Sequence, residues 1–485
     1  MANLEEIRKK RIEKLKKLAL RGMDPYPGSC QRTHDINEVV SCFSKLKGKE
    51  VIVVGRMRLL RGHGGAVFFD IEDGTDKIQV LFRKDKVGQK GFSFFKDFFD
   101  MGDFIEVKGK VVKTKTGEKT IEASDFQMLS KSLRPLPEKW HGLKDEEERL
   151  RKRYLDILFN PEIKEIVEKR DVFWNSMREF LKKRGFLEVE TPVLETTPGG
   201  ADARPFHTHH NALDLDVYLR ISMGELWQKR LMVAGFEKTF EIGRQFRNEG
   251  MDAEHLQDYT QMEFYLAYSD YREGMELVEE LYKHTAKKTF NTLKFEINGF
   301  KIDLAKKWKK YDFKEMVQKY TGIDVFENSL PEMEKKLKEL KVEYDKKGFN
   351  KARAIDNLWK YCRKKIQGPG FLINIPVLLS PLAKRHEKNE QLAQRLQVII
   401  GGSELGNGYS ELNNPLDQAE RFKEQQKMRE KGDEEAQRYD KDFVEALEYG
   451  MPPCFGFGVS ERLFSFLVGK PMRECQIFPL MRPKN

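Results

Sequence analysis

The sequence predicts an α+β protein in which a small five-stranded β-barrel precedes a larger domain of interleaved strands and helices. A chain of 485 residues is too long for one ordinary hydrophobic core, and its 39% hydrophobic content is enough to fill two. Residues 51–128 consist of short runs with the alternation of β-strands. Long amphipathic helical patterns and further strands follow residue 162. We therefore expect two domains.

Composition narrows the class of protein. Lys and Arg outnumber Asp and Glu by 88 to 78, a modest basic excess that permits a polyanionic partner without requiring one. No stretch has the roughly 18 uncharged apolar residues of a membrane span, and the basic N-terminus lacks the apolar core of a signal peptide. We expect a soluble, unexported protein with no membrane partner. A reducing cytoplasm fits the odd number of scattered cysteines, which form no C-x-x-C pair and so indicate neither disulfides nor zinc: Cys30, Cys42, Cys362, Cys454 and Cys475.

The first 50 residues form a basic lead-in. Helical spacing of apolar residues predicts a helix over 3–22, which the segment DPYPG at 24–28 ends. The basic face of this helix is explained by exposure to solvent. The alternative is that its lysines and arginines contact the phosphates of a nucleic acid.

Five strand-like runs between 51 and 133 predict a barrel of the OB-fold type, whose exposed strand face commonly binds single-stranded nucleic acid. Aromatic and basic side chains carry that chemistry, and the candidates are Arg56, Arg58, Arg61, Phe68 and Phe69. Each aromatic residue alone is also explained as part of the barrel core.

A proline-rich, highly charged stretch at 134–161 predicts a linker, and the larger domain occupies 162–485. It begins with an amphipathic helix around 162–184 that ends at Gly185, and the segment FLEVETPVLE (186–195) then alternates like a strand. A lysine-rich helical insertion at about 305–365 carries little that points to chemistry.

Charged side chains gather on the two strands expected at 240–250 and 258–268. Arg247 and Glu249 are two residues apart and would share a face of the first strand. Glu263 and Tyr265 would share a face of the second. Buried charges need partners, so this face indicates either a ligand site or a structural network of salt bridges.

Two glycine-rich blocks add to this set. In GGSELGNGYSELNNP (401–415), the glycines would let a ligand approach the backbone, and Glu404 and Glu411 are carboxylates of the kind that bind Mg²⁺ beside phosphate. Alternation also places Asn407, Tyr409 and Glu411 on one face. In GFGVSERLFSFL (456–467), Arg462 begins an apolar helix, which is typical of an anion site.

Several long segments, in the right order, resemble those of the lysyl-tRNA synthetases. Residues 185–222 are similar to motif 1 and the loop that follows it, FRNEG to MEFY resembles class II motif 2, and the stretch ending in Arg462 resembles motif 3. The segments ELGNGYSELNNPLDQAERF and QIFPLMRP are similar to that family as well. The resemblance covers nearly the whole chain. It implies an OB-fold anticodon-binding domain and a class II catalytic domain, an antiparallel sheet flanked by helices.

The resemblance also implies roles for individual residues. The two catalytic residues would be Arg247, which holds the α-phosphate and the amino acid carboxylate, and Arg462, which lies across adenine from Tyr259. Glu249 would read the base, and His255 would lie near the outer phosphates. The remaining implied residues are Glu404 and Glu411 for Mg²⁺; Gly200, Glu225, Arg247, Glu263, Tyr265, Asn407, Tyr409 and Glu411 for lysine; Glu404 also for ATP; and Arg61, Phe68 and Gln79 for a U-rich anticodon.

The implied activity is lysine–tRNA ligation: lysine and ATP, with Mg²⁺, give lysyl-adenylate, and lysine passes to the 3′-terminal ribose of tRNA(Lys). Motif 1, at about 160–192, implies a homodimer. An aspartyl or asparaginyl enzyme is a close alternative, but three glutamates in the pocket suit an ammonium group better. A paralogue that attaches lysine to protein would lack the barrel. A non-enzymatic RNA-binding protein would have no use for the phosphate-site residues.

Two departures from the family pattern stand out. Met223-Gly224 replaces the usual proline before Glu225 and makes the segment one residue longer. Motif 3 is one residue shorter and reads Ser460-Glu461-Arg462 in place of a pair ending in Asp-Arg.

Overall fold

The computed structural model describes residues 4–137, 145–250, 252, 254–346, 348–433 and 435–484. The chain divides into two compact units, Met1–Lys144 and Asp145–Asn485. Within the described residues, no helix combines the length and the apolar composition needed to cross a membrane.

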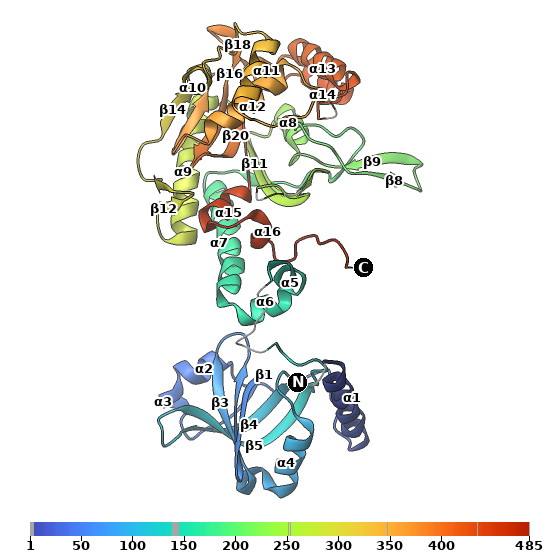
Figure 1. Cartoon of the computed structure of the whole chain (residues 1–485), viewed down its shortest axis with the longest axis vertical. Coiled ribbons are helices and arrows are strands. Elements are labelled where there is room, and N and C mark those ends of the chain that lie inside the picture. The colour runs from blue at the N-terminus through green and yellow to red at the C-terminus, as the bar shows by residue number, and fades with distance from the viewer. Residues whose placement is uncertain are drawn as a thin grey trace. The chain divides into compact units, whose positions relative to one another are not determined.

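The first unit is built around a closed five-stranded barrel with the strand order β1-β2-β3-β5-β4 (Figure 1). Neighbouring strands are antiparallel except β3 and β5, which run parallel. The strands are β1 (Glu50–His63), β2 (Ala66–Glu72), β3 (Lys77–Arg83), β4 (Phe104–Lys113) and β5 (Lys119–Ser130). The helices are α1 (Leu4–Leu20), α2 (Ile36–Ser41), α3 (Phe43–Leu46) and α4 (Lys84–Phe98).

Alternation along β2 separates the barrel core from its surface. Val67, Phe69 and Ile71 are buried in the core, whereas Phe68 is only half-buried and faces away from it. Both phenylalanines were candidate surface aromatics on the sequence pattern, and for Phe69 this prediction is wrong. The ring of Phe69 packs edge-on against Phe82 with centroids 5.2 Å apart.

The second unit begins with residues that the sequence analysis assigned to the linker. Residues 145–159 form the short helices α5 (Glu146–Arg151) and α6 (Arg153–Phe159), which lead into the long helix α7 (Pro161–Lys183). The expected helix end at Gly185 agrees with the structure, where this glycine has a φ of +81°.

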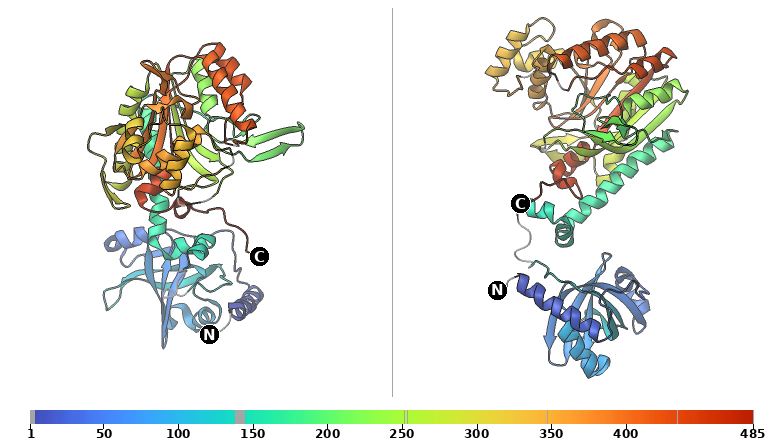
Figure 2. Two further views of the ribbon diagram at one scale, coloured as in Figure 1. Left: turned by 45° about the horizontal axis from the view of Figure 1, so that its top comes forward. Right: turned by 90° about the vertical axis from the view of Figure 1, so that its right-hand side faces the viewer.

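An eight-stranded sheet with the order β14-β15-β19-β20-β21-β11-β10-β6 forms the centre of this unit. The long helices α7 and α9 (Tyr271–Phe290) pack together, and they share one hydrophobic core with one face of the sheet (Figure 2). The strands are β6 (Leu187–Glu188), β10 (Lys238–Phe246), β11 (Asp258–Ala267), β14 (Lys309–Asp312), β15 (Gly370–Ile373), β19 (Arg395–Ile400), β20 (Ser403–Ser410) and β21 (Cys454–Ser460). They pair antiparallel except at the two edges, where β14 runs parallel to β15 and β6 to β10.

Smaller elements surround this sheet. In the described part of this unit, three short sheets lie outside it: β7 (Leu194–Glu195) with β8 (His207–His210) and β9 (Leu215–Leu219), β12 (Lys294–Ile297) with β13 (Phe300–Asp303), and β16 (Ile375–Pro376) with β17 (Arg385–His386) and β18 (Asn389–Ala393). The remaining helices are α8 (Glu225–Val233), α10 (Phe313–Thr321), α11 (Leu330–Glu339), α12 (Lys351–Arg363), α13 (Pro415–Glu430), α14 (Lys441–Glu448), α15 (Arg462–Val468) and α16 (Met472–Cys475), with a 3₁₀ turn at Val377–Leu379.

The structure differs from three of the predictions about local structure. The segment 186–195 is not one strand: β6 joins the large sheet and β7 joins a different one, and Pro192 between them lacks the N–H that a continuous ladder needs. Arg247 and Glu249 lie beyond the end of β10, in the loop that leads to β11. Residues 305–365 are not purely helical, because β14 adds an edge strand to the large sheet.

Candidate active site

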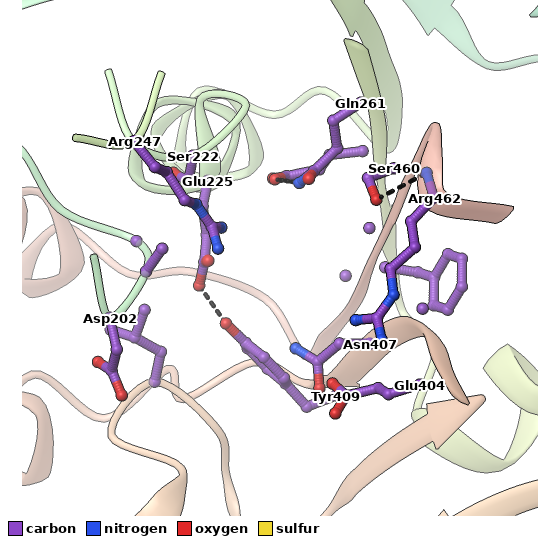
Figure 3. A pocket seen from close by; sticks show the side chains of 18 of the residues that line it. Asp202, Ser222, Glu225, Arg247, Gln261, Glu404, Asn407, Tyr409, Ser460 and Arg462 are labelled. Atoms are coloured by element: carbon purple, nitrogen blue, oxygen red, sulfur yellow. Dashed lines mark hydrogen bonds between the residues drawn. The ribbon is translucent and has the colours of Figure 1, made fainter. Parts of the chain in front are cut away.

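The face of the large sheet that points away from α7 and α9 forms the floor of a cavity of about 340 Å³ (Figure 3). Alternation along β11 produces this arrangement, because Met262 and Phe264 enter the hydrophobic core while Glu263 and Tyr265 line the cavity. All residues that the sequence analysis assigned to ATP, lysine or metal line it: Gly200, Glu225, Arg247, Glu249, His255, Tyr259, Glu263, Tyr265, Glu404, Asn407, Tyr409, Glu411 and Arg462.

Glycine on β21 gives the cavity its depth. A Cβ atom at Gly456 would lie 2.7 Å from Cε1 of Tyr265 and would clash with a carboxylate oxygen of Glu411. The neighbouring core-facing positions of the same strand are the large residues Phe455 and Phe457. Side chains at the cavity-facing positions would fill the space that a ligand needs.

Three buried carboxylates, those of Glu225, Glu263 and Glu411, gather in one part of the cavity, which we call the carboxylate end. The hydroxyl of Tyr409 donates a hydrogen bond to Glu225 (Figure 3). The hydroxyl of Tyr265 lies 3.4 Å from Glu263. Burial, together with the surrounding carboxylates, raises the pKa of both phenols well above the ordinary value, so both remain protonated donors.

A lysine that the sequence analysis did not single out completes the carboxylate end. Lys229 lies one helical turn after Glu225 on α8, and its Nζ is 2.9 Å from Oε1 of Glu225 and 2.5 Å from Oε2 of Glu411. Burial by itself would lower the pKa of Lys229, but the two carboxylates hold it above its ordinary value. The i, i+4 spacing of Glu225 and Lys229 was visible in the sequence, whereas the burial of the pair was not.

Among the three carboxylates, Glu263 has a pKa that is shifted close to neutral pH. Burial, with the charge of Glu225 as a further cause, raises the pKa of Glu263 to about 7. The backbone N–H of Met223 donates to Glu263 at 3.0 Å, and the side chain of Gln261 donates to the same oxygen. The carboxylate end therefore changes its charge near neutral pH.

The structure accounts for the departure before Glu225. Gly224 is the N-cap of α8 with a φ of +66°, a conformation that proline cannot adopt. A Cβ at this position would also clash with the hydroxyl of Thr191. Met223-Gly224 thus enters the helix by a left-handed residue, and Glu225 still faces the cavity.

Cationic side chains gather in a region we call the arginine end. Arg462, at the start of α15, lines the cavity, and Arg363, at the end of α12, lines an adjoining cavity that shares Arg462 and Glu404 with the first. Arg462 forms an ion pair with Glu254. Nη1 of Arg363 is 3.2 Å from Oε2 of Glu404, and its Nη2 is 3.9 Å from Glu254. Arg363 was not among the predicted site residues, because the sequence of an amphipathic helix does not show which cavity one of its basic residues faces.

Arg247 lies across the cavity from Arg462 (Figure 3). Its Nε donates to the carbonyl oxygen of Ile221 at 3.3 Å, and its guanidinium lies 5.8 Å from the ring centre of the buried Tyr259. Tyr259 sits in a small apolar cluster with Leu256 and Met472.

Two other predicted residues occupy the rim of the cavity. His255 is exposed, and its Nδ1 lies 2.8 Å from a carboxylate oxygen of Asp252. Glu249 is half-buried in the same loop and lines the cavity.

Glu404 and Glu411 both line the cavity but have different cationic partners, and a magnesium site formed by both stays a prediction. They are seven residues apart along extended β20 and its continuation, which corresponds to roughly 20 Å. Glu411 pairs with Lys229 and Glu404 with Arg363. Among the described residues, no group of three or more His, Cys, Asp or Glu side chains is arranged to hold a metal ion.

A second surface lies in the first unit, where a groove on the barrel is lined by Arg61, Phe68 and Gln79. Arg61 on β1 lies directly opposite Phe68 on β2. The hydroxyl of Thr120 donates to Oε1 of Gln79 at 2.9 Å. The three predicted anticodon residues therefore lie on one groove of the barrel.

Comparisons with known proteins agree with this geometry. Residues 145–482 match the family described as tRNA synthetases class II (D, K and N), and residues 51–129 match the family described as OB-fold nucleic acid binding domain. The chain is 43% identical to "Lysine--tRNA ligase" of Thermosipho africanus, 44% to that of Thermotoga maritima and 46% to that of Thermoanaerobacter sp. strain X514. Each of these alignments covers 99% of this chain and 97% of the relative.

Proposed function

Because the chain belongs to the lysine–tRNA ligases of the class II aminoacyl-tRNA synthetases, we propose that its carboxylate end receives the lysine side chain and its arginine end receives the phosphates of ATP. The reaction is the ATP-dependent joining of lysine to tRNA. The family match covers aspartate, lysine and asparagine enzymes, so the pocket itself must account for the choice of lysine.

The charge of the carboxylate end is the observation that carries this assignment. Glu225, Glu263 and Glu411 supply three carboxylates, and Lys229 balances one of them. An ammonium group is attracted to the remaining negative charge, whereas a substrate carboxylate would be repelled. Tyr265, Tyr409 and Asn407 line the same region and provide its polar contacts, and Gly200 leaves room at its edge.

Arg247 would lie between lysine and ATP. Its guanidinium can donate in parallel to the carboxylate of lysine and to the α-phosphate, two anions that must meet. A lysine carboxylate oxygen would attack the α-phosphorus as pyrophosphate leaves. The terminal ribose hydroxyl of tRNA would then attack the lysyl carbonyl carbon as AMP leaves. The described residues contribute by positioning these groups and by stabilising negative charge on phosphorus oxygens.

The adenine would lie between Tyr259 and Arg462, within reach of Glu249, and His255 would lie near the outer phosphates. A buried aromatic ring with a guanidinium across the cavity supports this placement, because both groups can stack on a base.

The family uses Mg²⁺ with ATP, and Glu404 and Glu411 would hold this ion. Oε1 of Gln397, on the strand next to Glu404, is buried and has no hydrogen-bond partner among the described residues. Glu404 and Gln397 line one cavity and offer two oxygen atoms of the kinds that bind Mg²⁺. The ion would neutralise charge on the phosphates.

In the barrel, Phe68 would stack on one unpaired base of the tRNA(Lys) anticodon, the Gln79 amide would hydrogen-bond to the edge of another, and Arg61 would bind phosphate or a further base. The half-buried position of Phe68 outside the barrel core supports this role.

Homodimer formation is supported by exposed apolar side chains along 160–195. Val172, Leu187, Val193 and Leu194 are each at least 41% exposed. Light scattering at assay concentration tests this assembly, and a monomer with full activity would exclude it. The five free cysteines support a reducing, cytoplasmic location.

ATP–pyrophosphate exchange tests the assignment of the pocket. The purified protein should exchange label in the presence of lysine and not in the presence of aspartate or asparagine. Exchange that depends on aspartate would overturn the assignment of the carboxylate end.

A further inference from the structure

Arg363 is the last residue of α12, in the segment 305–365 that the sequence pattern marked only as a lysine-rich insertion. Helices α10, α11 and α12 have their own hydrophobic core, in which Phe313, Leu337 and Trp359 are buried. This core fixes the end of α12, and the Arg363 side chain extends from it to Glu404 on β20, where it lines the adjoining cavity that forms part of the arginine end.

Arg363 is largely buried, but not all of its guanidinium N–H groups have a hydrogen-bond partner within the described ranges. Its side chain is only 12% exposed, it makes one hydrogen bond to Glu404, and its Nε has no partner among the described residues. Arg462 shows the same feature, because its Nε is also buried and has no partner in the described part of the chain. Each arginine can therefore accept a further anionic partner.

Glu254 lies between the two guanidiniums. Its carboxylate forms an ion pair with Arg462, lies 3.9 Å from Arg363, and accepts a hydrogen bond from the hydroxyl of Ser403 at 3.1 Å. Two like charges in a site with little solvent repel each other unless an anion bridges them. The presence of Arg363 accordingly lowers the pKa of Arg462 further, after the larger effect of burial. Glu254 and Glu404 supply one negative charge each, and a phosphate in the place of Glu254 would supply more than that carboxylate does.

The position of Glu404 along β20 indicates which phosphates of ATP Arg363 would bind. Glu404, the partner of Arg363, stands at the end of β20 that is roughly 20 Å from Glu411. The α-phosphate must lie beside the lysine carboxylate, so the outer phosphates extend away from Glu411. They would reach the end of the cavity that Arg363 and Arg462 share.

We propose that Arg363 is a phosphate-binding residue that, together with Arg462, holds the β- and γ-phosphates of ATP in the position that the Glu254 carboxylate occupies in the free protein. This inference deepens the proposed function and rests on it. It assigns part of the ATP site to a segment outside the three class II motifs, and it makes Glu254 a competitor of the nucleotide for the two arginines.

Steady-state ATP–pyrophosphate exchange at saturating Mg²⁺ tests the role of Arg363. The variant Arg363→Gln should raise the KM for ATP and the KM for pyrophosphate by about tenfold or more, as expected for the loss of one charge-assisted hydrogen bond. The KM for lysine should change less than about twofold, because the carboxylate end is untouched. Arg363→Lys should recover part of the lost affinity for ATP and pyrophosphate, since lysine retains the positive charge but lacks the paired N–H donors of the guanidinium.

Lys365→Gln is the matched control. Lys365 is an exposed basic residue two positions further along, whose Nζ is bonded to the hydroxyl of Tyr361, and it does not line the cavity. Its loss should leave all three KM values unchanged. Equal KM values for ATP in Arg363→Gln and Lys365→Gln would overturn the proposal. A change confined to the Mg²⁺ requirement would also overturn it, since Arg363 would then act only by positioning Glu404.

Glu254→Gln should act in the opposite direction. Removal of the competing charge should lower the KM for ATP or the Kd of ATP measured by calorimetry, and an increase would exclude Glu254 as a competitor. The calorimetric Kd needs no lysine. If the wild-type protein failed to show lysine-dependent exchange, the proposed function would fail, while ATP binding to Arg363→Gln and to the wild type would still decide the role of Arg363.

Discussion

The ammonium of Lys229 lies 2.5 Å from the carboxylate of Glu411, which lines the cavity, and the two side chains are 0% and 1% exposed. Glu225 is the second partner of the same ammonium. A protein lysine thus sits behind the carboxylates that are proposed to bind a substrate lysine. It holds them in place and reduces the negative charge that the cavity presents to solvent.

Removal of this resident cation should destabilise the free protein. Lys229→Met leaves two buried carboxylates without their counter-ion, a change that typically costs about 3–5 kcal/mol in the free energy of unfolding. Because a bound lysine would return positive charge to the site, added lysine should raise the Tm of Lys229→Met more than that of the wild type. Differential scanning fluorimetry with and without lysine measures both effects.

Lys423→Met is the control for this experiment, since Lys423 forms an exposed ion pair with Glu420. Its Tm should hardly change, and its response to lysine should equal that of the wild type. A Lys229→Met protein with wild-type stability would mean that the pair contributes nothing to the fold.

The raised pKa of Glu263 predicts a specific pH dependence of stability. With a folded-state pKa of about 7, Glu263 keeps its proton between pH 4.5 and pH 7, whereas the unfolded chain has released it. Stability therefore falls as pH rises through this window, and the full cost, about 3 kcal/mol, is present above pH 7. Glu263→Gln should remove that cost. Urea unfolding of both proteins from pH 5 to pH 8 should show the variant gaining relative to the wild type, and parallel curves would contradict the assignment.

The same titration should affect substrate binding. Protonation of Glu263 removes one negative charge from the carboxylate end, so the KM for lysine should rise as pH falls below about 7. In Glu263→Gln the KM for lysine should not change over this pH range. The KM for ATP should have the same pH profile in the variant and in the wild type.

Arg247→Ala should strongly reduce adenylate formation and leave the fold intact, because this residue is assigned to both anions that react. Loss of one charged contact in a site with little water should cost on the order of 3 kcal/mol in the activation barrier, roughly a hundredfold in rate. Arg244→Ala is the matched control, since Arg244 lies on β10, pairs with Asp258 and does not line the cavity. Normal exchange in a folded Arg247→Ala protein would show that the motif is misread.

In the barrel, Phe68→Ala should reduce the charging of tRNA about tenfold or more and leave tRNA-free exchange nearly unchanged, because stacking on a base contributes roughly 1–3 kcal/mol. Phe69→Ala is the contrasting variant: Phe69 is 1% exposed, and its loss should lower the Tm through a core cavity. Parallel damage by Phe68→Ala to stability, exchange and charging would mean that Phe68 also belongs to the core.

The sequence alone determined the fold class and the kind of enzyme, and both are confirmed by the family matches. It did so because local patterns carry this information: strands alternate every second residue, so Glu263 and Tyr265 could be placed on one face before the sheet was known. The long motifs around Arg247, Glu411 and Arg462 are also contiguous in the chain. All thirteen residues predicted for lysine, ATP or metal line the one cavity.

Only the tertiary structure decided which charges meet across the chain. Glu404 and Glu411 share one motif but lie at opposite ends of an extended strand, whereas Lys229 and Glu411 are far apart in sequence and in contact. Arg363 reaches Glu404 because the packing of an insertion core sets where α12 ends. Spacing within one element fixes direction and distance only along that element, and the partner of a charge on another element depends on how the two pack.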